Sequence, residues 1–356
     1  MKKSRVRTRG YIDTDVYTEA KKRIHHIFAT FDTIVVMFSG GKDSLATLHL
    51  VKEVSEELGI HKVNVVFRDE ELIPQCVIDF VDKYYHEDWV DMKYFAVPLH
   101  SQKYILGKTE SYVQWDKTRR HVRQPPEYAI TTPDGDDRIF TQDTMDGYIA
   151  ANYTGKIAFV NGIRASESLV RLRASINKMN ENYINATKSN LPHVKFCKPI
   201  YDWEENDVFK YFYEAGIEYC MIYDWQMWNS DQLRVATPVH QEAAKTFFRL
   251  KSRDPDLYAQ VIDIFPEMLL QERYFKEYDR DAEKERYSKS LNHVLDWIKE
   301  NITEPKQRHE AYAMFKQTVG LHRHDPEAYP LHHILNHFMT GGYKRVLMPV
   351  GKDSRK

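Results

Sequence analysis

Cysteine and long apolar runs are scarce in this sequence of 356 residues. The three cysteines, Cys76, Cys197 and Cys220, stand far apart, and none forms a Cys-x-x-Cys pair. They are too few for a disulfide framework, a thiolate zinc site or an iron–sulfur cluster. No apolar run approaches the roughly 18 residues that a membrane span needs, and none follows the basic first residues as in a secretory signal. The sequence therefore predicts a cytoplasmic protein with no membrane segment and no iron–sulfur cluster.

An excess of charge of either sign is also missing, since 51 Lys and Arg residues stand against 52 Asp and Glu residues. A chain with near-zero net charge has no overall attraction to nucleic acid or to a membrane surface. Any electrostatic binding site must therefore be local.

Short apolar runs alternate with amphipathic stretches in the first half of the chain. The runs are rich in β-branched residues, as buried parallel strands are; they are Thr33–Phe38, Lys62–Phe67, Lys93–Val97 and Lys156–Val160. Apolar residues at helical spacing predict helices over Asp15–Phe31, Leu45–Leu58 and Ile73–Tyr85. This alternation predicts an α/β fold, a parallel sheet with helices on both faces.

Two regions depart from this pattern. From Gly107 to Tyr153 the sequence is rich in Pro, Asp, Gly and Arg without a clear period, which predicts an insertion or lid over residues 107–153. Beyond Pro238 the sequence is charged, strand-poor and helical in pattern. We therefore predict an α/β domain over residues 1–238 and a helical C-terminal domain over residues 239–356.

The motif Ser39-Gly40-Gly41-Lys42-Asp43-Ser44 lies between a predicted strand and a predicted helix. The glycines allow a tight turn, and they let phosphate oxygens approach the backbone N–H groups at the helix N-terminus. Ser39 and Ser44 can donate hydroxyl hydrogen bonds, Lys42 adds a positive charge, and Asp43 could hold a Mg²⁺ that bridges phosphates. No Walker A frame is present. The motif resembles the pyrophosphate loop of the PP-loop ATP pyrophosphatases, which cleave ATP between the α and β phosphates or bind related adenylates.

A second motif, Asn161-Gly162-Ile163-Arg164-Ala165-Ser166-Glu167-Ser168, ends a predicted strand and is followed by Arg171. Arg164 and Arg171 can both point to the carboxyl edge of the sheet, where open α/β sheets bind ligands. Two guanidinium groups there would bind sulfate, phosphate or a carboxylate. Alternatively, Arg171 only forms a surface ion pair with Glu167, four residues earlier on a helix.

Together with Pro199-Ile200-Tyr201-Asp202-Trp203, the second motif is similar to the signature of the phosphoadenosine phosphosulfate (PAPS) reductase family. The resemblance implies a site for ATP or a PAPS-like adenine nucleotide, with Mg²⁺ held at Asp43. Its expected binding residues are Ser39, Gly40, Gly41, Lys42, Asp43, Ser44, Gly162, Arg164, Glu167 and Arg171. Those expected to act in catalysis are Lys42, Asp43, Arg164 and Arg171. Asp69, Glu70 and Glu71 also end a predicted strand at this edge. One of the three is expected to contact a ribose or Mg²⁺, and Asp69 is named as that residue, although the sequence does not distinguish among them.

The sequence departs from a reductase of this family in its thiols. The family reduces sulfate through the cysteine of a Glu-Cys-Gly-x-His tail, but no cysteine occurs after Cys220, and the nearest lookalike has Val319 at that position. Thiol-based reduction therefore lacks a nucleophile there.

Other stretches resemble a divergent branch of the family that includes the immunoglobulin-binding regulator A proteins of phages and prophages. They are the region from Trp115 to Pro125 and the strings Ile222-Tyr223-Asp224 and Leu233-Arg234-Val235-Ala236-Thr237-Pro238. This resemblance implies a protein partner of the ParB type. The cations of Lys117–Arg123, together with the aromatic residues Tyr112 and Trp115, suit nucleic-acid binding, and the alternative is a solvated surface loop.

The first function hypothesis is an ATP-dependent nucleotidyl transferase or pyrophosphatase. The second is a sulfonucleotide enzyme that obtains electrons from a partner or from Cys197. The third is a nucleotide-sensing regulator without turnover. His333 and His337 lie one turn apart near the C-terminus, but no third ligand is evident, so we expect a helix surface there and not a metal site.

Overall fold

The computed structural model describes residues 13–168, 171–172, 182–187, 191–229, 231–275, 280–302 and 304–351. These residues divide into two compact units. The first contains the described residues of Met1–His100 and Val113–Val235, and the second those of Ser101–Tyr112 and Ala236–Lys356. The division after Val235 lies close to Pro238, but residues 101–112 belong to the second unit. That the two parts act as separate functional domains stays a prediction.

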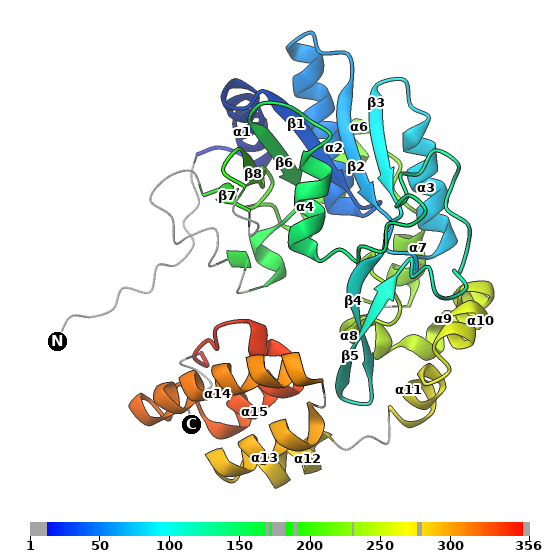
Figure 1. Cartoon of the computed structure of the whole chain (residues 1–356). Coiled ribbons are helices and arrows are strands. Elements are labelled where there is room, and N and C mark those ends of the chain that lie inside the picture. The colour runs from blue at the N-terminus through cyan, green and yellow to red at the C-terminus, as the bar shows by residue number, and fades with distance from the viewer. Residues whose placement is uncertain are drawn as a thin grey trace, which may run out of the picture. The chain divides into compact units, whose positions relative to one another are not determined.

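The first unit is built on a six-stranded sheet with the order β3-β2-β1-β6-β8-β7 (Figure 1). The strands are β1 (Thr33–Phe38), β2 (Val63–Arg68), β3 (Val90–Phe95), β6 (Ile157–Asn161), β7 (Ile184–Ala186) and β8 (Val194–Cys197). All neighbours pair in parallel except β7, which runs antiparallel to β8. The predicted α/β fold is thus confirmed.

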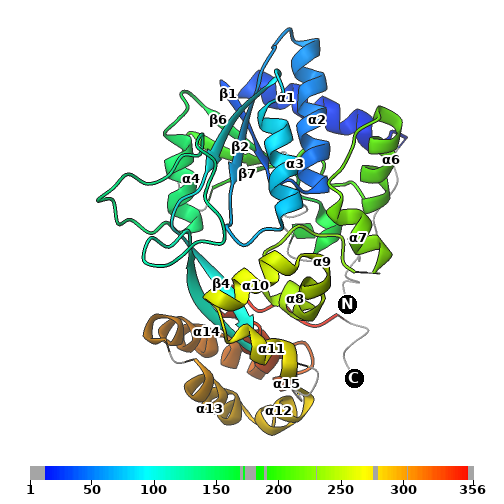
Figure 2. The ribbon, with the colours of Figure 1, turned by 90° about the vertical axis from the view of Figure 1, so that its right-hand side faces the viewer.

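Alternate residues of the strands enter two different cores, because successive side chains of a strand point to opposite faces. Val36 and Val65 share one core with α1 (Val16–Thr30), α2 (Lys42–Glu57), α3 (Gln75–Tyr85) and α6 (Glu205–Ala215). Val35 and Val66 share the other core with Met145 and Ile149 of α4 (Gln142–Ala150). Helices therefore cover both faces, and Figure 2 shows α4 on the face opposite α2 and α3.

The structure corrects several predicted elements. The third strand begins at Val90 and not near Lys93, and the region from Gly107 to Tyr153 is not irregular throughout. It contains β5 (Lys108–Gln114), which pairs with β4 (Leu99–Ile105), and also α4. The polar pattern of these elements hid them from a search for apolar runs. A lid function of residues 107–153 stays a prediction.

The second unit is helical beyond the hairpin. Its core combines α12 (Arg280–Tyr287), α13 (Leu291–Asn301), α14 (Pro305–His324) and α15 (Leu331–Met339). Shorter helices precede this core along the chain. The first of them, α7 (Ile222–Trp228), lies near the end of the first unit. The others belong to the second unit and are α8 (Gln241–Ala244), α9 (Leu250–Arg253), α10 (Pro255–Ile264) and α11 (Met268–Tyr274). Among the described residues, no helix has the length and apolar character to cross a membrane.

The C-terminal histidines contact backbone carbonyls. Ring nitrogens of His322, His333 and His337 lie 2.7, 2.7 and 3.1 Å from the carbonyl oxygens of Tyr329, Met348 and Arg345. A nitrogen that donates to a carbonyl carries a proton and cannot bind a metal. In the part of the chain that the structure describes, no three His, Cys, Asp or Glu side chains form a metal-binding group.

Buried ion pairs tie the insertion to the end of β2. Both Glu71 carboxylate oxygens accept bonds of 2.7 Å from Arg119, and Asp69 pairs with Arg123. Neither acidic side chain is exposed. The backbone N–H of Trp115 also donates to Glu71 (2.6 Å). A buried carboxylate needs such partners, since removal of one leaves an uncompensated charge.

This network predicts the cost of breaking it. Arg123→Ala leaves the Asp69 carboxylate buried without its cation, and we expect a loss of about 3–5 kcal/mol in the free energy of unfolding. Urea denaturation measures the change. Arg138→Ala is the control, because Arg138 pairs with Asp136 in the same insertion but is 62% exposed. Equal effects of the two substitutions would contradict the structural role of the network.

Candidate functional site

Two of the sequence motifs meet at the switch point of the sheet, where the order of the strands reverses between β1 and β6. The chain builds outward from β1 through β2 and β3, and then returns to the other side of β1 with β6. The parallel register places Met37 opposite Asn161, so both strands end at the same edge. The loop Ser39–Gly41 therefore lies beside residues 162–164, at the position where open α/β sheets bind ligands.

Glycine is required where the two motifs touch. A Cβ atom on Gly162 would lie 2.3 Å from the carbonyl oxygen of Asp43 and 2.5 Å from the backbone nitrogen of Ser44. Gly40 has a φ of +70°, and a Cβ there would lie 2.8 Å from Val77 Cγ1. Backbone packs directly on backbone at Gly162, and the turn at Gly40 needs a left-handed residue.

The loop points hydrogen-bond donors at this edge. The Ser44 hydroxyl donates to the carbonyl of Gly41 (2.9 Å) and lies 3.0 Å from the Ser39 hydroxyl. Gly41 is the N-cap of α2 and supplies no side-chain cap. The first N–H groups of a helix lack intrahelical acceptors and favour an anion. The loop thus combines two hydroxyls with a helix N-terminus.

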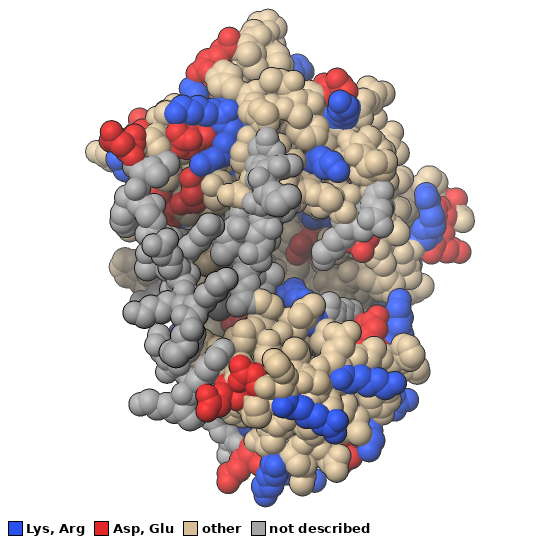
Figure 3. All heavy atoms as spheres, turned by 90° about the vertical axis from the view of Figure 1, so that its left-hand side faces the viewer, with Lys and Arg blue, Asp and Glu red and all other residues tan. Residues whose placement is uncertain are grey.

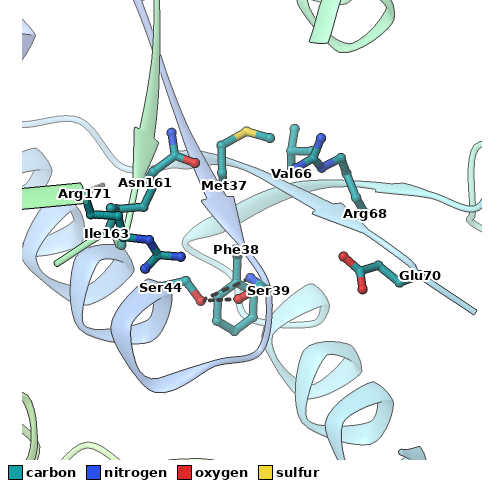
Figure 4. Close-up of a pocket in the computed structure, with 11 residues that line it drawn as sticks. Met37, Phe38, Ser39, Ser44, Val66, Arg68, Glu70, Asn161, Ile163 and Arg171 are labelled. Carbon is teal, nitrogen blue, oxygen red and sulfur yellow. Dashed lines mark hydrogen bonds between the residues drawn. The ribbon is translucent and has the colours of Figure 1, made fainter. Parts of the chain in front are cut away.

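A cavity of about 300 Å³ opens at this edge. It is lined by Met37, Phe38, Ser39, Ser44, Val66, Arg68, Glu70, Asn161, Gly162, Ile163 and Arg171. In Figure 4, the hydrogen-bonded Ser39 and Ser44 lie between Arg171 on one side and Glu70 on the other. The predicted residues Ser39, Ser44, Gly162 and Arg171 thus come together in one cavity. Gly40, Gly41, Lys42, Asp43, Asp69, Arg164 and Glu167 are not part of its lining.

Lys42 is buried, and its charge is bound within the protein and not in the lining of the cavity. Its Nζ donates to the carbonyl of Leu233 (2.7 Å) and lies 3.2 Å from a Glu205 carboxylate oxygen. Its backbone N–H donates to the Tyr223 hydroxyl oxygen (2.7 Å). The lysine therefore joins the loop to the segments that contain Glu205, Tyr223 and Leu233. Sequence reasoning missed these contacts, because nothing local links positions so far apart in the chain.

Asp43 is compensated by two cations. Arg164 Nε lies 2.6 Å from Asp43 Oδ1, and Lys42 Nζ lies 3.4 Å from Oδ2. Mg²⁺ prefers several oxygen ligands and would be repelled by both cations. The described residues therefore do not fit a protein-held Mg²⁺ at Asp43 in this arrangement, and the predicted metal role of Asp43 receives no support.

For Arg171 the motif left open either a ligand contact or a surface ion pair with Glu167, and the structure is compatible with both. Arg171 forms an ion pair with Glu167, four residues earlier, and it also lines the cavity. Burial lowers the pKa of its guanidinium, and the nearby positive charges of Arg234 and Arg164 act in the same direction. Since Glu167 also accepts a bond from the backbone N–H of Arg164 (3.2 Å), it holds Arg171 relative to the end of β6.

Of the three acidic residues after β2, Glu70 lines the cavity. Asp69 accepts bonds from the Tyr94 hydroxyl and from the backbone N–H of Glu71, in addition to Arg123. Burial raises the pKa of the Glu70 carboxyl above its ordinary value, and Asp69 adds to this, whereas Arg68 and Arg234 oppose it. Asp69 is thus engaged within the protein, and Glu70 is the one of the three that lies in the cavity wall.

The predicted nucleic-acid surface of Lys117–Arg123 is not supported. Arg119 and Arg123 are bound to Glu71 and Asp69, and Lys117 donates to the carbonyls of Pro133 and Asp136. These cations hold the insertion in place. On the face that Figure 3 shows, positive and negative side chains are interspersed within each unit.

None of the three cysteines lines the cavity. Cys197 at the end of β8 is fully buried, and this burial raises the pKa of its thiol to about 12. A thiol that is neither ionised nor accessible cannot act as a nucleophile. The proposal that Cys197 supplies electrons therefore finds no support.

Comparison with known proteins assigns the family. The model of the phosphoadenosine phosphosulfate reductase domain matches residues 33–227, which is more than half of the chain. The chain belongs to this family. The match begins at β1 and spans all six strands of the sheet, the loop after β1 and the Gly162–Arg171 motif. The expected membership of the phage and prophage branch stays a prediction.

One curated relative is the uncharacterized protein YbdN of Escherichia coli (strain K12), which is 30% identical over 210 residues. The match spans 56% of this chain and 52% of YbdN, so the chain spans about half the length of that relative.

Solved structures are similar at lower identity. The FMN adenylyltransferase of Candida glabrata with FMN and AMPCPP is 15% identical, with a TM-score of 0.41 over 61% of this chain and 64% of that one. The PAPS reductase of Candida auris is 13% identical, with a TM-score of 0.34 over 61% of this chain and 94% of that one.

The close approach at Gly162 yields a stability prediction. Gly162→Ala forces a methyl group against the backbone of α2, and we expect a loss of about 1–3 kcal/mol or more in the free energy of unfolding. Gly147→Ala is the matched control in α4, where a Cβ meets only Leu191 Cδ1 at 3.9 Å. There alanine should be neutral or stabilising, by up to about 1 kcal/mol. Chemical denaturation of both variants measures the difference, and a tolerated Gly162→Ala would contradict the described contact.

Proposed function

We propose that this protein binds an adenine nucleotide in the cavity and cleaves ATP between its α and β phosphates, either to adenylate an acceptor or to release pyrophosphate. One observation carries the proposal: the cavity joins Ser39 and Ser44 of the loop to Arg171 at the switch point of the sheet. Hydroxyl donors, a helix N-terminus and a guanidinium together suit a phosphate chain.

The proposed step is nucleophilic displacement at the α-phosphorus. An acceptor oxygen forms a bond to the α-phosphorus, and the bond to the oxygen that bridges the α and β phosphates breaks. The electron pair leaves with pyrophosphate, and a proton on the acceptor passes to solvent. With water as the acceptor, the products are AMP and pyrophosphate.

The chain's own groups would stabilise the charge in this step. The Ser39 hydroxyl would exchange its bond to Ser44, and the Ser44 hydroxyl its bond to the Gly41 carbonyl, for bonds to phosphate oxygens. Arg171, held by Glu167, would lie beside the charge that develops in the transition state, where preorganised donors contribute most. Glu70 would accept a bond from a ribose hydroxyl at the other side of the cavity. Lys42, Asp43 and Arg164 would position the loop.

A nucleotide-sensing regulator without turnover is the second candidate. One observation favours it. Lys42, Asp43 and Arg164 form ion pairs with one another, and none of these expected catalytic residues lines the cavity. A sulfonucleotide enzyme would need electrons from outside the chain. A ParB-like partner, a requirement for Mg²⁺ and a cytoplasmic location stay predictions.

Incubation with ATP and MgCl₂, followed by separation of the nucleotides and assay of pyrophosphate, tests the proposal. Pyrophosphate with AMP or an adenylated acceptor would support cleavage, whereas tight ATP binding without any product would favour the regulator. Gly41→Val should abolish both binding and product, because a Cβ at Gly41 already lies 3.2 Å from the Ser39 and Tyr223 hydroxyl oxygens. Wild-type ATP affinity in this variant would contradict the role of the loop.

Arg171 gives a second test. Arg171→Ala removes a charge-assisted hydrogen bond to phosphate, worth about 1.5–3 kcal/mol, and should weaken ATP binding about tenfold or more. Arg171→Lys should restore only part of the affinity, since a point charge cannot form a bidentate contact. Isothermal titration calorimetry measures both variants.

The matched control is Lys210→Ala on α6. Lys210 forms an ion pair with Glu214 at the same four-residue spacing, 3.6 Å apart, away from the cavity. This substitution should leave ATP affinity unchanged. If both substitutions leave the ATP affinity unchanged, Arg171 only forms its ion pair with Glu167 and does not bind the nucleotide.

A further inference from the structure

Arg234 is an exposed cation beside the cavity that the proposed function leaves unused. Its backbone is held on both sides by the buried side chain of Gln226 on α7. Gln226 Nε2 donates to the carbonyl of Arg234 (2.6 Å), and the backbone N–H of Arg234 donates to Gln226 Oε1 (2.9 Å). A buried amide that satisfies both backbone groups of one residue fixes where its side chain begins.

The segment around Arg234 is docked on the nucleotide loop. Leu233, the preceding residue, accepts the 2.7 Å hydrogen bond from Lys42 Nζ. Val235, the following residue, has Cγ2 3.8 Å from the position of a Cβ on Gly41. Arg234 is thus flanked by two contacts to the loop, although its position is far from the loop in the sequence.

The charge of Arg234 acts on the cavity. It lowers the pKa of the Arg171 guanidinium and opposes the rise in the pKa of Glu70, and both of these residues line the cavity. Among the described residues, its guanidinium has no hydrogen-bond or ion-pair partner, in contrast to Lys42, Arg164 and Arg171.

The loop's own lysine is engaged elsewhere. Lys42 Nζ is bound by the Leu233 carbonyl and lies near Asp43 and Glu205, so its charge is compensated within the protein. A phosphate chain at Ser39 and Ser44 therefore needs cations from other segments. Arg171 is one of them, and the contacts of Leu233 and Val235 with the loop place Arg234 next to the same loop.

We propose that Arg234 binds the phosphate chain of the nucleotide and that Gln226 positions it. The inference rests on the proposed nucleotide site. A guanidinium forms two parallel hydrogen bonds to phosphate oxygens and keeps its charge at all working pH values. Its contribution should therefore grow with the number of phosphates on the ligand.

The test compares ATP, ADP, AMP and adenosine by calorimetric titration with the full-length chain. Arg234→Ala should weaken ATP binding about tenfold or more, AMP less, and adenosine not at all. Arg234→Lys should recover part of the loss for ATP. Arg138→Ala, which removes a surface arginine paired with Asp136, is the control and should match the wild type. An equal loss for ATP and adenosine, or no loss at all, would overturn the assignment.

A double-mutant cycle tests the positioning role of Gln226. Gln226→Leu should weaken ATP binding in the wild-type background but have no further effect once Arg234 is alanine, because the two residues then act through one interaction. Equal losses in both backgrounds would show that Gln226 only supports the fold. If the wild-type protein binds no ATP, the proposed function itself fails. If it binds ATP and Arg234→Ala binds equally well, only this inference fails.

Discussion

The direct contact between the end of β6 and the first turn of α2 is the constraint on which the site depends. Gly162 has no side chain, so the backbone of Asp43 and Ser44 can approach it more closely than any Cβ would allow. The parallel pairing of β1 with β6 brings the two strand ends to this point. Because both contacts are made by backbone, the sheet itself sets the distance between the serine loop and the end of β6. The ion pair of Glu167 with Arg171 then holds the guanidinium relative to that end.

The charged residues around this contact divide into two groups. Lys42, Asp43, Arg164 and Glu205 compensate one another within the protein, and Lys42 is almost completely buried. Buried charges need such partners, so these groups hold the loop in shape. Arg171 lines the cavity, and Arg234 is exposed and lowers the pKa of the Arg171 guanidinium. This division accounts for a cationic loop motif whose lysine does not face the cavity.

The end of β2 shows the same division. Asp69 and Glu71 are buried against Arg123 and Arg119, whereas Glu70 lines the cavity. Two acidic residues thus hold the insertion to the sheet, and the one between them is left for a ligand.

The sequence by itself determined the apolar strands, the helices between them and the family. Runs of β-branched residues marked β1, β2 and β6, since buried strands need them on both faces, and the loop glycines marked a turn that other residues cannot adopt. Three ordered motifs implied the family, and the family model confirms it. Only the tertiary structure decided which charges face the cavity. Lys42 meets Leu233, Asp69 meets Arg123, and Arg171 lies near Arg234. Such partners are far apart along the chain. The position of a charged side chain depends on the partner that compensates it, and no local pattern of residues encodes that partner.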